Sequence, residues 1–495
     1  MDRLGDAEGA DWRSIVSALR RAGLLQSVSP GDPPLSGLAD DSRLVEGGEL
    51  FLALPGVTTD GLRFVPQAMA RGAAAVIAES VVDTGGVPVA EVADARQAAR
   101  LIAAVWYGRP AQRLDLIGVT GTNGKTTTTA LIRHLLNADG TVGSLGTLGA
   151  IDGAGRRVPS TAGLLTTPGP VDLQATLARM VAGGTSAVVL EASSHSLDQG
   201  RLDGLEFSAA VFTNLSRDHL DYHGTMAAYR SAKLSLCRLL GPDGAAVLNR
   251  DDDSWREAAL EAPRRITFGL DPAADLRGEV SWLGAAGSRF EVSGRFGRRV
   301  VELPLVGGFN VANALGAAAC AIALGVDLDL VAARLATAPQ VPGRMERIAR
   351  YPCPVIRDYA HTPDALDRVL AALRPLVPGR LIVVFGCGGD RDRGKRPLMG
   401  RIAAELSDVA ILTSDNPRTE DPETILDDVE QGMGSIRHRR IVDRREAIAA
   451  ALEEADPDDT VVLAGKGHET YQVIGTERQP FDEVAIVREL GGREG

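Results

Sequence analysis

Short apolar runs separated by turn-forming residues predict an α/β fold for the first hundred residues. Residues 49–54 and 73–78 are apolar runs of strand length, and stretches rich in Gly and Asp separate them. Runs bounded in this way are typical of strands. A helical pattern over residues 98–105 is interrupted at Gly108 and Pro110, which do not favour a continuing helix. We therefore predict a small α/β domain over residues 1–108.

The next part of the chain predicts a nucleotide-binding domain over residues 109–342. A strand over residues 114–119 is followed by a glycine-rich loop and then by a helix over residues 125–136. Further apolar strands, residues 187–190 and 209–212, end in polar residues, as strands do at the ligand-binding edge of a parallel sheet. An Ala-rich helix over residues 313–324 precedes the boundary at Pro342–Gly343.

The last part repeats this alternation. Residues 381–385, 409–413 and 460–464 read as strands with helical patterns between them, which predicts a Rossmann-like α/β domain over residues 343–495. Three domains agree with a length of 495 residues, since a single core stops growing at roughly 250–300 residues. The expected fold class is therefore α/β with three domains, the central one a parallel-sheet domain of P-loop ATPase type.

Composition narrows the classes of function. The hydrophobic fraction of 44% and charged fraction of 24% are typical of a soluble globular protein, and no apolar run approaches the roughly 18 residues of a membrane span. The acidic N-terminus lacks a signal-like apolar stretch, so we expect a cytoplasmic protein, and a monomer. A net charge of -12 disfavours nucleic acid as a partner. The four cysteines lie far apart in the sequence and predict no disulfide framework.

The glycine-rich loop carries the strongest chemical signal. Its position between a strand and a helix lets backbone N–H groups hold phosphate oxygens. Lys125 would contact the β- and γ-phosphates of ATP, and the Thr126 hydroxyl would ligate Mg²⁺. Val119 stands where the general Walker pattern has glycine, and a turn with an exposed lysine is the alternative interpretation. The predicted ATP-binding residues here are Gly121, Thr122, Asn123, Gly124, Lys125, Thr126 and Thr127.

This loop, with tandem threonines after the lysine, resembles that of the Mur ligase family and its folylpolyglutamate synthase relatives. The resemblance implies that Glu191 and His219 hold Mg²⁺ with Thr126, and that Lys233 is carbamylated by CO₂ to give a further anionic metal ligand. By itself Lys233 would read as a solvated helix lysine. The implied catalytic residues are therefore Lys125, Glu191, His219 and Lys233, the last as N6-carboxylysine.

Further ATP contacts follow from the same resemblance. Asn310 and Asn313 match residues that contact adenine, although Asn310 could instead cap a helix. Arg344 and Asp358 match residues that reach the phosphate and the ribose of ATP when the domains close.

The muramyl substrate is implied by other motifs. Asp41-Ser42-Arg43, Phe51 and residues 56–61 resemble the UDP-binding domain of the family members that extend a UDP-linked muramyl dipeptide, a domain that folylpolyglutamate synthases lack. Residues 165–169 and 191–201 resemble the segments that hold the dipeptide, with Ser196 where glycine is commoner. The implied residues for UDP-MurNAc-L-Ala-D-Glu are Ser42, Thr166, Thr167, Ser193, Gln199 and Arg201.

Three polar segments follow the three strands of the last domain, so we expect them to converge on the amino-acid substrate. The implied residues are Arg391, Asp415, Asn416, Arg418, Gly465 and Glu469. The string Asp-Asn-Pro-Arg at 415–418 is associated in the family with meso-diaminopimelate, whose distal carboxylate an arginine can bind. The alternative places Arg418 in a turn that faces solvent.

The resemblance implies an ATP-dependent ligase of peptidoglycan precursor synthesis. It would join meso-diaminopimelate to the D-glutamate of the muramyl dipeptide through an acyl phosphate. Three alternatives stay open: the same reaction with L-lysine, a glutamyl ligase of folylpolyglutamate type, and a nucleotide-binding scaffold without activity.

Overall fold

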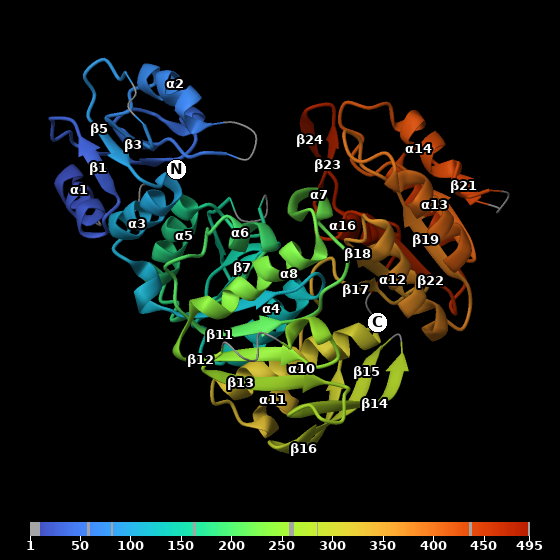
Figure 1. Ribbon diagram of the computed structural model, residues 1–495. Helices are drawn as coiled ribbons and strands as arrows, with labels where there is room; N and C mark the ends of the chain where they lie inside the picture. The colour runs from blue at the N-terminus through green and yellow to red at the C-terminus, as the bar shows by residue number, and fades with distance from the viewer. Residues whose placement is uncertain are drawn as a thin grey trace. The chain divides into compact units, whose positions relative to one another are not determined.

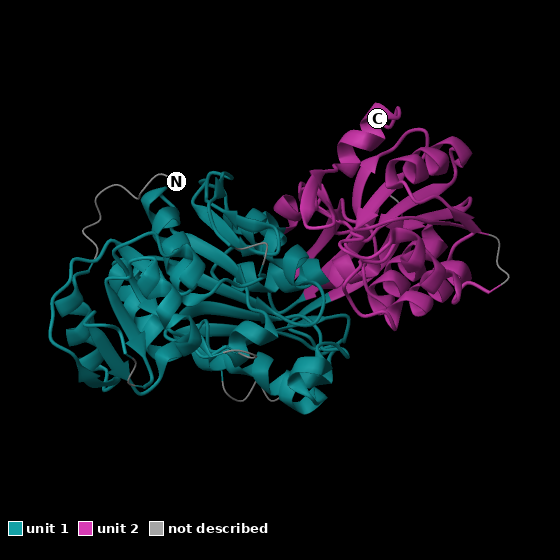
Figure 2. Ribbon diagram, turned by 90° about the horizontal axis from the view of Figure 1, so that it is seen from above, with its two compact units in different colours: residues 1–277, 294–296, 313–331 teal, residues 278–293, 297–312, 332–495 magenta. Residues whose placement is uncertain are grey.

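The computed structural model describes residues 10–56, 60–80, 83–161, 165–256, 262–284, 286–434 and 438–493. Residues 57–59, part of the predicted UDP-binding motif, lie outside this set. The chain forms two compact units, which are coloured separately in Figure 2. Unit 1 comprises Met1–Arg277, Gly294–Phe296 and Asn313–Val331, and unit 2 comprises the remainder. Among the described residues, no helix is both long enough and apolar enough to cross a membrane.

Unit 1 begins with a five-stranded sheet in the order β1-β5-β4-β3-β2 (Figure 1). All its neighbouring strands are parallel except β1, which runs antiparallel to β5. Buried Trp12, Leu19, Leu50 and Ile102 belong to one core cluster, which α1 and α3 cover. The elements are α1 (Trp12–Arg21), β1 (Leu25–Val28), β2 (Gly37–Ala39), η1 (Ser42–Leu44), β3 (Glu49–Leu52), η2 (Gly61–Phe64), α2 (Val65–Ala70), β4 (Ala75–Ala78), β5 (Val89–Val92) and α3 (Ala95–Trp106).

The larger sheet of unit 1 has β6 at its centre, between β11 and β10. Its strands run parallel in the order β13-β12-β11-β6-β10-β7, and β8 and β9 continue the sheet antiparallel. The strands are β6 (Asp115–Thr120), β7 (Val142–Gly146), β8 (Gly149–Ile151), β9 (Arg157–Val158), β10 (Ala187–Glu191), β11 (Phe207–Phe212), β12 (Leu240–Asn249) and β13 (Arg264–Gly269). The carboxyl ends of β6, β10 and β11 therefore meet at one edge.

Helices connect these strands, as a parallel arrangement requires. They are η3 (Pro110–Arg113), α4 (Lys125–Leu136), α5 (Pro170–Ala182), α6 (Ser194–Asp198), α7 (Leu220–His223), α8 (Met226–Leu234), η4 (Ser235–Leu239) and η5 (Asp253–Trp255). Further along the chain come β14 (Leu276–Gly284), β15 (Gly287–Gly294), β16 (Gly297–Leu303), α10 (Gly308–Ala323) and α11 (Leu328–Leu335). The helix predicted from residue 313 thus begins five residues earlier, at Gly308.

Unit 2 contains a six-stranded sheet in the order β17-β18-β22-β19-β20-β21. Only β17 runs antiparallel to its neighbour. The strands are β17 (Glu346–Ala349), β18 (Val355–Asp358), β19 (Leu381–Phe385), β20 (Val409–Leu412), β21 (His438–Arg440) and β22 (Thr460–Ala464), with a hairpin of β23 (Tyr471–Ile474) and β24 (Glu477–Pro480). The helical elements are α12 (Pro363–Leu373), η6 (Arg374–Leu376), α13 (Lys395–Leu406), α14 (Pro422–Glu430), α15 (Arg444–Glu454) and α16 (Glu483–Glu489).

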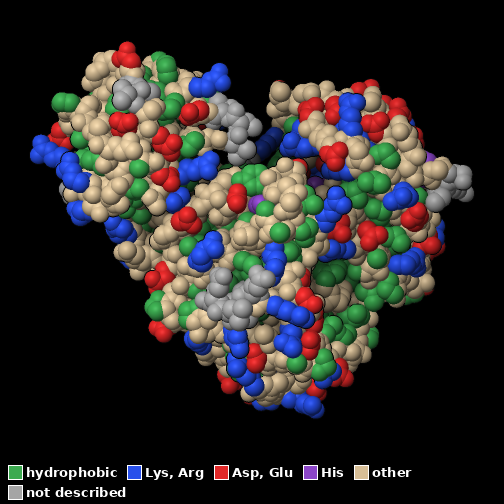
Figure 3. Space-filling model, viewed as in Figure 1, with side chains coloured by type: hydrophobic (Ala, Val, Ile, Leu, Met, Phe, Trp, Pro, Cys, Tyr) green, Lys and Arg blue, Asp and Glu red, His purple; other side chains and the backbone are tan. Residues whose placement is uncertain are grey.

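The three strands predicted in this sheet are confirmed, because β19 and β22 have the expected bounds and β20 ends one residue early. Their apolar runs are buried except for partly buried Val409 at the start of β20, and helices pack against the sheet. Such continuous burial is typical of parallel strands. Basic and acidic side chains are interspersed on the face of the molecule shown in Figure 3.

Candidate functional site

The loop between β6 and α4 has a conformation that requires glycine at two positions. Gly121 has φ +145° and Gly124 has φ +83°, both in the region that side chains disfavour. A Cβ atom on Gly121 would collide with the Thr213 hydroxyl, and one on Gly124 with the Asn313 side-chain oxygen. Helix α4 begins directly after Gly124, and the first N–H groups of a helix have no partners within the helix. They are therefore suited to bind an anion at the loop.

The segment after β11 holds this loop in place. The Asn123 N–H donates to Oδ1 of Asn214 at 3.0 Å, and the Thr213 hydroxyl donates to the Asn123 carbonyl at 2.6 Å. The hydroxyls of Thr122 and Tyr229 lie 3.2 Å apart. These bonds fix the loop before any ligand is bound, because they join it to two further elements.

Two lysines meet at the same loop carbonyl. Lys125 Nζ donates to the carbonyls of Gly121 and Thr122 at 3.0 and 2.8 Å, and Lys233 Nζ donates to that of Gly121 at 2.7 Å. Lys233 is only 1% exposed and its Nζ lies 4.5 Å from the centre of the Tyr229 ring. The interpretation of Lys233 as a solvated lysine is therefore wrong.

Burial changes the chemistry of Lys233. Its pKa is lowered well below the ordinary lysine value, first by burial and then by the neighbouring charge of Lys125, while Asp218 opposes the shift. A lysine in such surroundings gives up its proton more readily than one in water. The neutral amine, which is the nucleophilic form, is thus more accessible here than on a surface lysine.

Glu191, at the end of β10, is buried beside the start of α4. Its Oε2 accepts hydrogen bonds from the hydroxyls of Thr126 at 3.2 Å and Thr147 at 3.0 Å, and its Oε1 accepts from the Thr147 N–H at 2.9 Å. The predicted proximity of Thr126 and Glu191 is confirmed. Across the described residues, however, no three His, Cys, Asp or Glu side chains are grouped closely enough to form a metal site by themselves.

A cavity of about 340 Å³ brings together predicted residues from several segments of unit 1. His219, which begins α7 with a left-handed φ of 52°, lies in its wall, and the centre of its ring is 4.8 Å from that of His195. The predicted residues that line the cavity are Lys125, Thr166, Thr167, Ser193, Arg201, His219 and Lys233. His195, which lies within the predicted segment 191–201, and Tyr229 line it as well, although neither was named as a site residue.

The wall formed by Thr167 and Arg201 is ordered by hydrogen bonds. The Thr167 hydroxyl donates to the Glu191 carbonyl at 2.7 Å, and Arg201 Nη1 donates to the Thr167 carbonyl at 2.8 Å. Arg201 also donates through Nε and Nη2 to Oε1 of Gln199 at 3.0 and 2.7 Å. Ser193 caps α6 by accepting from the Ser196 N–H at 3.1 Å. A guanidinium, an amide and several hydroxyls are thus held in fixed positions around one space.

Ser42 and Asn313 lie in unit 1 but do not line this cavity. Ser42 is 5% exposed and its hydroxyl donates to Oε1 of Gln67 at 2.7 Å. Asn313 lies beside Gly124, and its Oδ1 accepts from the Thr128 hydroxyl at 3.5 Å. Neither placement tests the roles predicted for these residues.

In unit 2, the predicted ATP contacts occupy three positions. Asn310 lies inside the first turn of α10 and donates to the Val306 carbonyl at 2.9 Å, so its alternative role as a helix N-cap is wrong. Asp358, at the end of β18, accepts from the Met345 N–H at 2.7 Å. Burial raises the pKa of Asp358 to about 6, against the opposing effect of Arg344. The Arg344 guanidinium lies 5.0 Å from the centre of the Tyr359 ring.

The three polar segments at the ends of β19, β20 and β22 converge, as predicted. The Gly389 N–H donates to the Asn416 carbonyl at 2.9 Å, and Arg418 Nη1 donates to the Gly389 carbonyl at 2.7 Å. Asn416 Nδ2 donates to Oε2 of Glu469 at 3.0 Å. Arg418 is half-buried and has φ +53°, and the bond from its Nη1 directs the guanidinium toward the loop after β19. Arg391, by contrast, is exposed.

Lys466 is the residue of this cluster that sequence reasoning missed. It is fully buried, and its Nζ donates to Oδ1 of Asn416 at 3.1 Å and lies 3.5 Å from Oε2 of Glu469. Gly465 has φ +117°, and a Cβ there would lie 2.5 Å from Oδ2 of Asp415, an oxygen that has no partner among the described residues. Lys466 directly follows Gly465 and precedes Glu469, and both of those residues were predicted to contact the amino acid.

Comparisons with known proteins cover almost the whole chain. Models described as Mur ligase family catalytic domain, Mur ligase middle domain and Mur ligase glutamate ligase domain match residues 34–113, 119–321 and 343–467. The chain is 48% identical to the UDP-N-acetylmuramoyl-L-alanyl-D-glutamate–2,6-diaminopimelate ligase of Gloeobacter violaceus, covering 95% of this chain and 96% of the relative. It is 46% identical to the ligase of the same name from Geobacillus kaustophilus, with coverage of 92% and 95%.

Solved structures give the same result for the fold. A structure of a UDP-N-acetylmuramoyl-L-alanyl-D-glutamate–2,6-diaminopimelate ligase is 38% identical, with a TM-score of 0.67 and coverage of 97% and 98%. A folylpolyglutamate synthase from Mycobacterium tuberculosis, solved with ADP and AMPPCP, is 21% identical with a TM-score of 0.61, and it covers 74% of this chain, which shows a shared fold. From the loop geometry and these matches together, the chain belongs to the Mur ligase family, whose three-domain α/β fold and ATP-dependent ligase chemistry it shares.

Proposed function

We propose that the chain is the ATP-dependent ligase that joins meso-diaminopimelate to the D-glutamate of UDP-N-acetylmuramoyl-L-alanyl-D-glutamate in peptidoglycan precursor synthesis. The observation that carries this proposal is the cavity where Lys125, Thr167, Arg201 and Lys233 meet, in a chain 48% identical to a ligase named for this reaction. The same proposal includes the cytoplasmic location and the monomeric state expected from the sequence. It also includes ATP as the nucleotide that this chain binds.

The first step activates a carboxylate, which is a poor acyl donor. The γ-carboxylate of D-glutamate attacks the γ-phosphorus of ATP, the bond to the bridging oxygen breaks, and an acyl phosphate and ADP form. Lys125 is placed to exchange its bonds to loop carbonyls for bonds to phosphate oxygens. The loop N–H groups at the start of α4 hold the phosphates. Arg344 and Asp358 are carried over as ATP contacts, with Asn310 and Asn313 for adenine.

The muramyl dipeptide is assigned to the ordered wall of the cavity. Arg201 pairs with a carboxylate, and Thr166, Thr167, Ser193 and Gln199 hydrogen-bond the sugar and the peptide. Ser42 is assigned to the UDP moiety on the strength of the sequence motif.

The donor groups fit a Mg²⁺ ion bound together with nucleotide. Thr126 and Glu191 present a hydroxyl and a carboxylate 3.2 Å apart, and His219 lies in the wall of the same cavity as Lys125. Mg²⁺ retains waters and takes substrate phosphates as ligands, so few protein ligands are needed. When bound, it would neutralise charge on the phosphates.

Lys233 is assigned as a carbamate. The ammonium of Lys233 first loses a proton to solvent, which the low pKa favours. The neutral amine then attacks CO₂, a nitrogen–carbon bond forms and a second proton leaves to solvent, so the buried cation has become an anion. The low pKa of the amine favours this reaction, and the carbamate N–H can still donate to the Gly121 carbonyl. The product would favour Mg²⁺ where an ammonium would repel it.

The second step forms the amide bond. The amine of diaminopimelate attacks the acyl carbon, and the tetrahedral intermediate releases phosphate. Arg418 and Arg391 bind the distal carboxylate, and Glu469 with Asp415 and Asn416 receives the ammonium at the end of the three converging strands. Gly465 allows close approach of the backbone there, because its φ is +117°.

The division into domains is proposed at 1–108, 109–342 and 343–495. It is supported by family matches that begin or end near these points, at 113, 119, 321 and 343, and by a separate sheet in each part.

Phosphate release tests the proposal. Purified chain with ATP, Mg²⁺ and the UDP-muramyl dipeptide is given meso-diaminopimelate, L-lysine or no amino acid. We expect sustained release only with meso-diaminopimelate. Preference for L-lysine would favour the lysine ligase, and equal release in all three reactions would contradict amide ligation. In a separate reaction with ATP, Mg²⁺, a folate and L-glutamate, glutamylation of the folate would favour the folylpolyglutamate type.

A further inference from the structure

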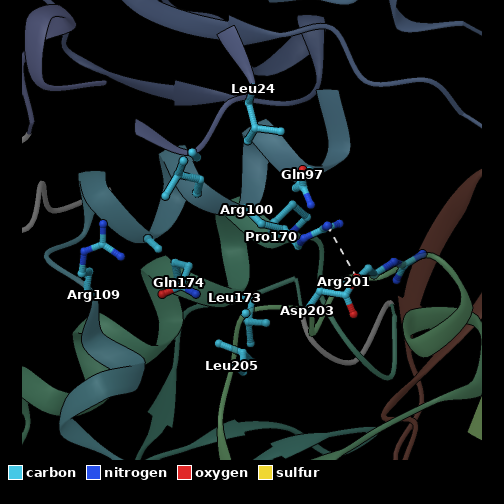
Figure 4. Close-up of a pocket in the computed structure, with 14 residues that line it drawn as sticks. Leu24, Gln97, Arg100, Arg109, Pro170, Leu173, Gln174, Arg201, Asp203 and Leu205 are labelled. Atoms are coloured by element: carbon cyan, nitrogen blue, oxygen red, sulfur yellow. Dashed lines mark ion pairs between the residues drawn. The ribbon is translucent and has the colours of Figure 1, made fainter. Parts of the chain in front are cut away.

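A second cavity in unit 1, also of about 340 Å³, lies apart from the phosphate loop (Figure 4). Helix α3, the residues that follow α1 and Arg109 form one wall, and α5 with the segment after α6 forms the other. None of the residues that line it was assigned above except Arg201, which lines both cavities. The proposed reaction leaves this space unused.

The lining of this second cavity is amphipathic. Its apolar part includes Leu24, Pro170, Leu173 and Leu205. In Figure 4, Arg100, Arg201 and Asp203 lie on one side of these residues, and Arg109 and Gln174 lie on the other. Such a space suits a ligand with an apolar body and polar ends.

Charge favours an anion. Three arginines line the cavity, and Asp203 is the sole acidic side chain among its described lining residues. Arg100 has a side chain only 15% exposed, and Asp203 lies 3.5 Å away, beyond the roughly 2.7–2.9 Å of a strong charge-assisted bond. The Arg100 guanidinium therefore retains donors for an incoming anion.

A second observation also indicates a ligand. Gln174 is 6% exposed and lines the cavity, and its Oε1 is buried without a hydrogen-bond partner in the described part of the chain. An unpaired buried amide oxygen is destabilising, and native structures seldom retain one without a partner or a role. A hydrogen-bond donor on a bound molecule would satisfy it.

We propose that this cavity binds a small organic anion with an apolar body and a hydrogen-bond donor at its far end. Arg100 binds its carboxylate or phosphate, and Oε1 of Gln174 accepts from the donor. Arg201 lines both cavities and donates to Gln199 and Thr167, so a bound anion that moves its guanidinium also changes the wall of the first cavity. Occupancy thus alters the KM for the UDP-muramyl dipeptide. This last consequence rests on the proposed function, whereas binding itself does not.

Binding is measured on the full chain by saturation-transfer NMR, without ATP or muramyl substrate. The probes are 4-hydroxyphenyl phosphate and 3-(4-hydroxyphenyl)propionate, which separate the two anionic groups and carry a hydroxyl donor, with 4-hydroxybenzyl alcohol as the neutral control. We expect at least one anion to bind and the neutral alcohol not to. Equal binding of the neutral alcohol, or no binding of either anion, overturns the proposal.

Variants locate the site. Arg100→Gln and Gln174→Leu, which removes the acceptor, should each weaken anion binding about tenfold, equivalent to about 1.4 kcal/mol. Asp203→Asn should strengthen it, because a competing carboxylate is removed. Arg113→Gln, an exposed arginine nearby that does not line the cavity, should leave it unchanged. Unchanged circular dichroism and thermal midpoint show that each variant folds.

Two outcomes would overturn the proposal. One is that both weakening variants bind the anion as the unmodified chain does, and the other is that Lys125→Ala abolishes binding, which would place the anion on the phosphate loop. The effect of the anion on the KM is then measured in the ligase reaction. If that reaction fails with every amino acid, the proposed function falls while the binding result stands.

Discussion

At the scale of single residues, the site depends on side chains that burial has changed. Lys233 lies almost wholly inside the protein with its amine on the Gly121 carbonyl, and Asp358 lies inside unit 2 with a raised pKa. In both cases the charged form is disfavoured by removal from water. Each residue therefore differs in reactivity or in charge from the same residue at a surface.

Replacing Lys233 separates a carbamate from a simple cation. We expect Lys233→Ala to lower kcat about 10²-fold, as loss of a group that stabilises the transition state does, and short carboxylates such as acetate to restore part of it. Lys233→Arg keeps a cation but cannot form the carbamate, so it should be equally inactive and resist rescue. Steady-state phosphate release measures both. An active Lys233→Arg variant would contradict the carbamate.

Asp358 predicts a pH dependence of stability in unit 2. Its folded pKa of about 6 lies above the unfolded value, so its contribution is fully present below about pH 4 and is lost as the pH rises through about 6. Asp358→Asn has no carboxyl group to titrate at this position, so its stability does not fall for this reason as the pH rises. We expect the variant to gain on the order of 3 kcal/mol over the original chain between pH 4 and 7.

Hydrogen exchange of the amides in β17 and β18, without nucleotide, measures this change. The two proteins are compared at each pH, so that intrinsic exchange rates cancel. A difference that stays constant from pH 4 to 7 would show that the Asp358 carboxylate does not titrate differently in the folded chain.

At the scale of elements, the site is made of loops that follow parallel strands. The loop after β6 is held by the segment after β11, and the loops after β19, β20 and β22 hold each other. Strand ends at a common edge explain why residues distant in sequence converge. The loop conformations require glycine at Gly121, Gly124 and Gly465.

Lys466 positions the loops of unit 2. Lys466→Met keeps much of the side-chain volume but removes the donor from Asn416 and Glu469. Because hydrogen bonds to charged groups contribute about 1.5–3 kcal/mol, we expect the KM for diaminopimelate to rise tenfold or more while the KM for ATP changes little. Arg401→Met, on the exposed face of α13, is the control. Parallel increases in both KM values would indicate general unfolding instead.

Arg418 is expected to decide which amino acid is used. Arg418→Asn removes the guanidinium that would pair with the distal carboxylate, while Asn tolerates the left-handed φ of 53°. We expect kcat/KM for meso-diaminopimelate to fall about 10²-fold with a smaller change for L-lysine. The ratio of the two kcat/KM values is the readout, and an unchanged ratio would remove Arg418 from the specificity pocket.

Several helices and strands could be predicted from the sequence. The strands at 381–385 and 460–464 and the helix from Lys125 were predicted within a residue, because apolar runs and glycines mark them directly. The helix before residue 313 was missed because Gly308 and Asn310 are weak helix formers. Lys466 was missed because a lysine reads as solvated until the packing around it is known. The unassigned cavity had no signal, since its walls come from distant segments.

At the scale of the whole molecule, two compact units divide the chemistry that the sequence assigned to three domains. Unit 1 contains the phosphate loop and the cavity proposed for the muramyl dipeptide, and unit 2 contains the cluster proposed for the amino acid. The family likeness extends over both, covering 95% of the chain. In the proposed reaction, amide ligation needs the residues of both units. We therefore expect the activity only of the intact chain.

Analysis of the products formed when two amino acids compete tests whether the chain joins meso-diaminopimelate to the muramyl dipeptide. The intact chain is given ATP, Mg²⁺, the UDP-muramyl dipeptide and equal concentrations of meso-diaminopimelate and L-lysine, and the UDP-linked products are identified by mass spectrometry alongside released phosphate. We expect the diaminopimelate adduct as the main product, with one phosphate released for each amide formed. A predominance of the lysine adduct, or phosphate release without any amide product, would contradict this expectation.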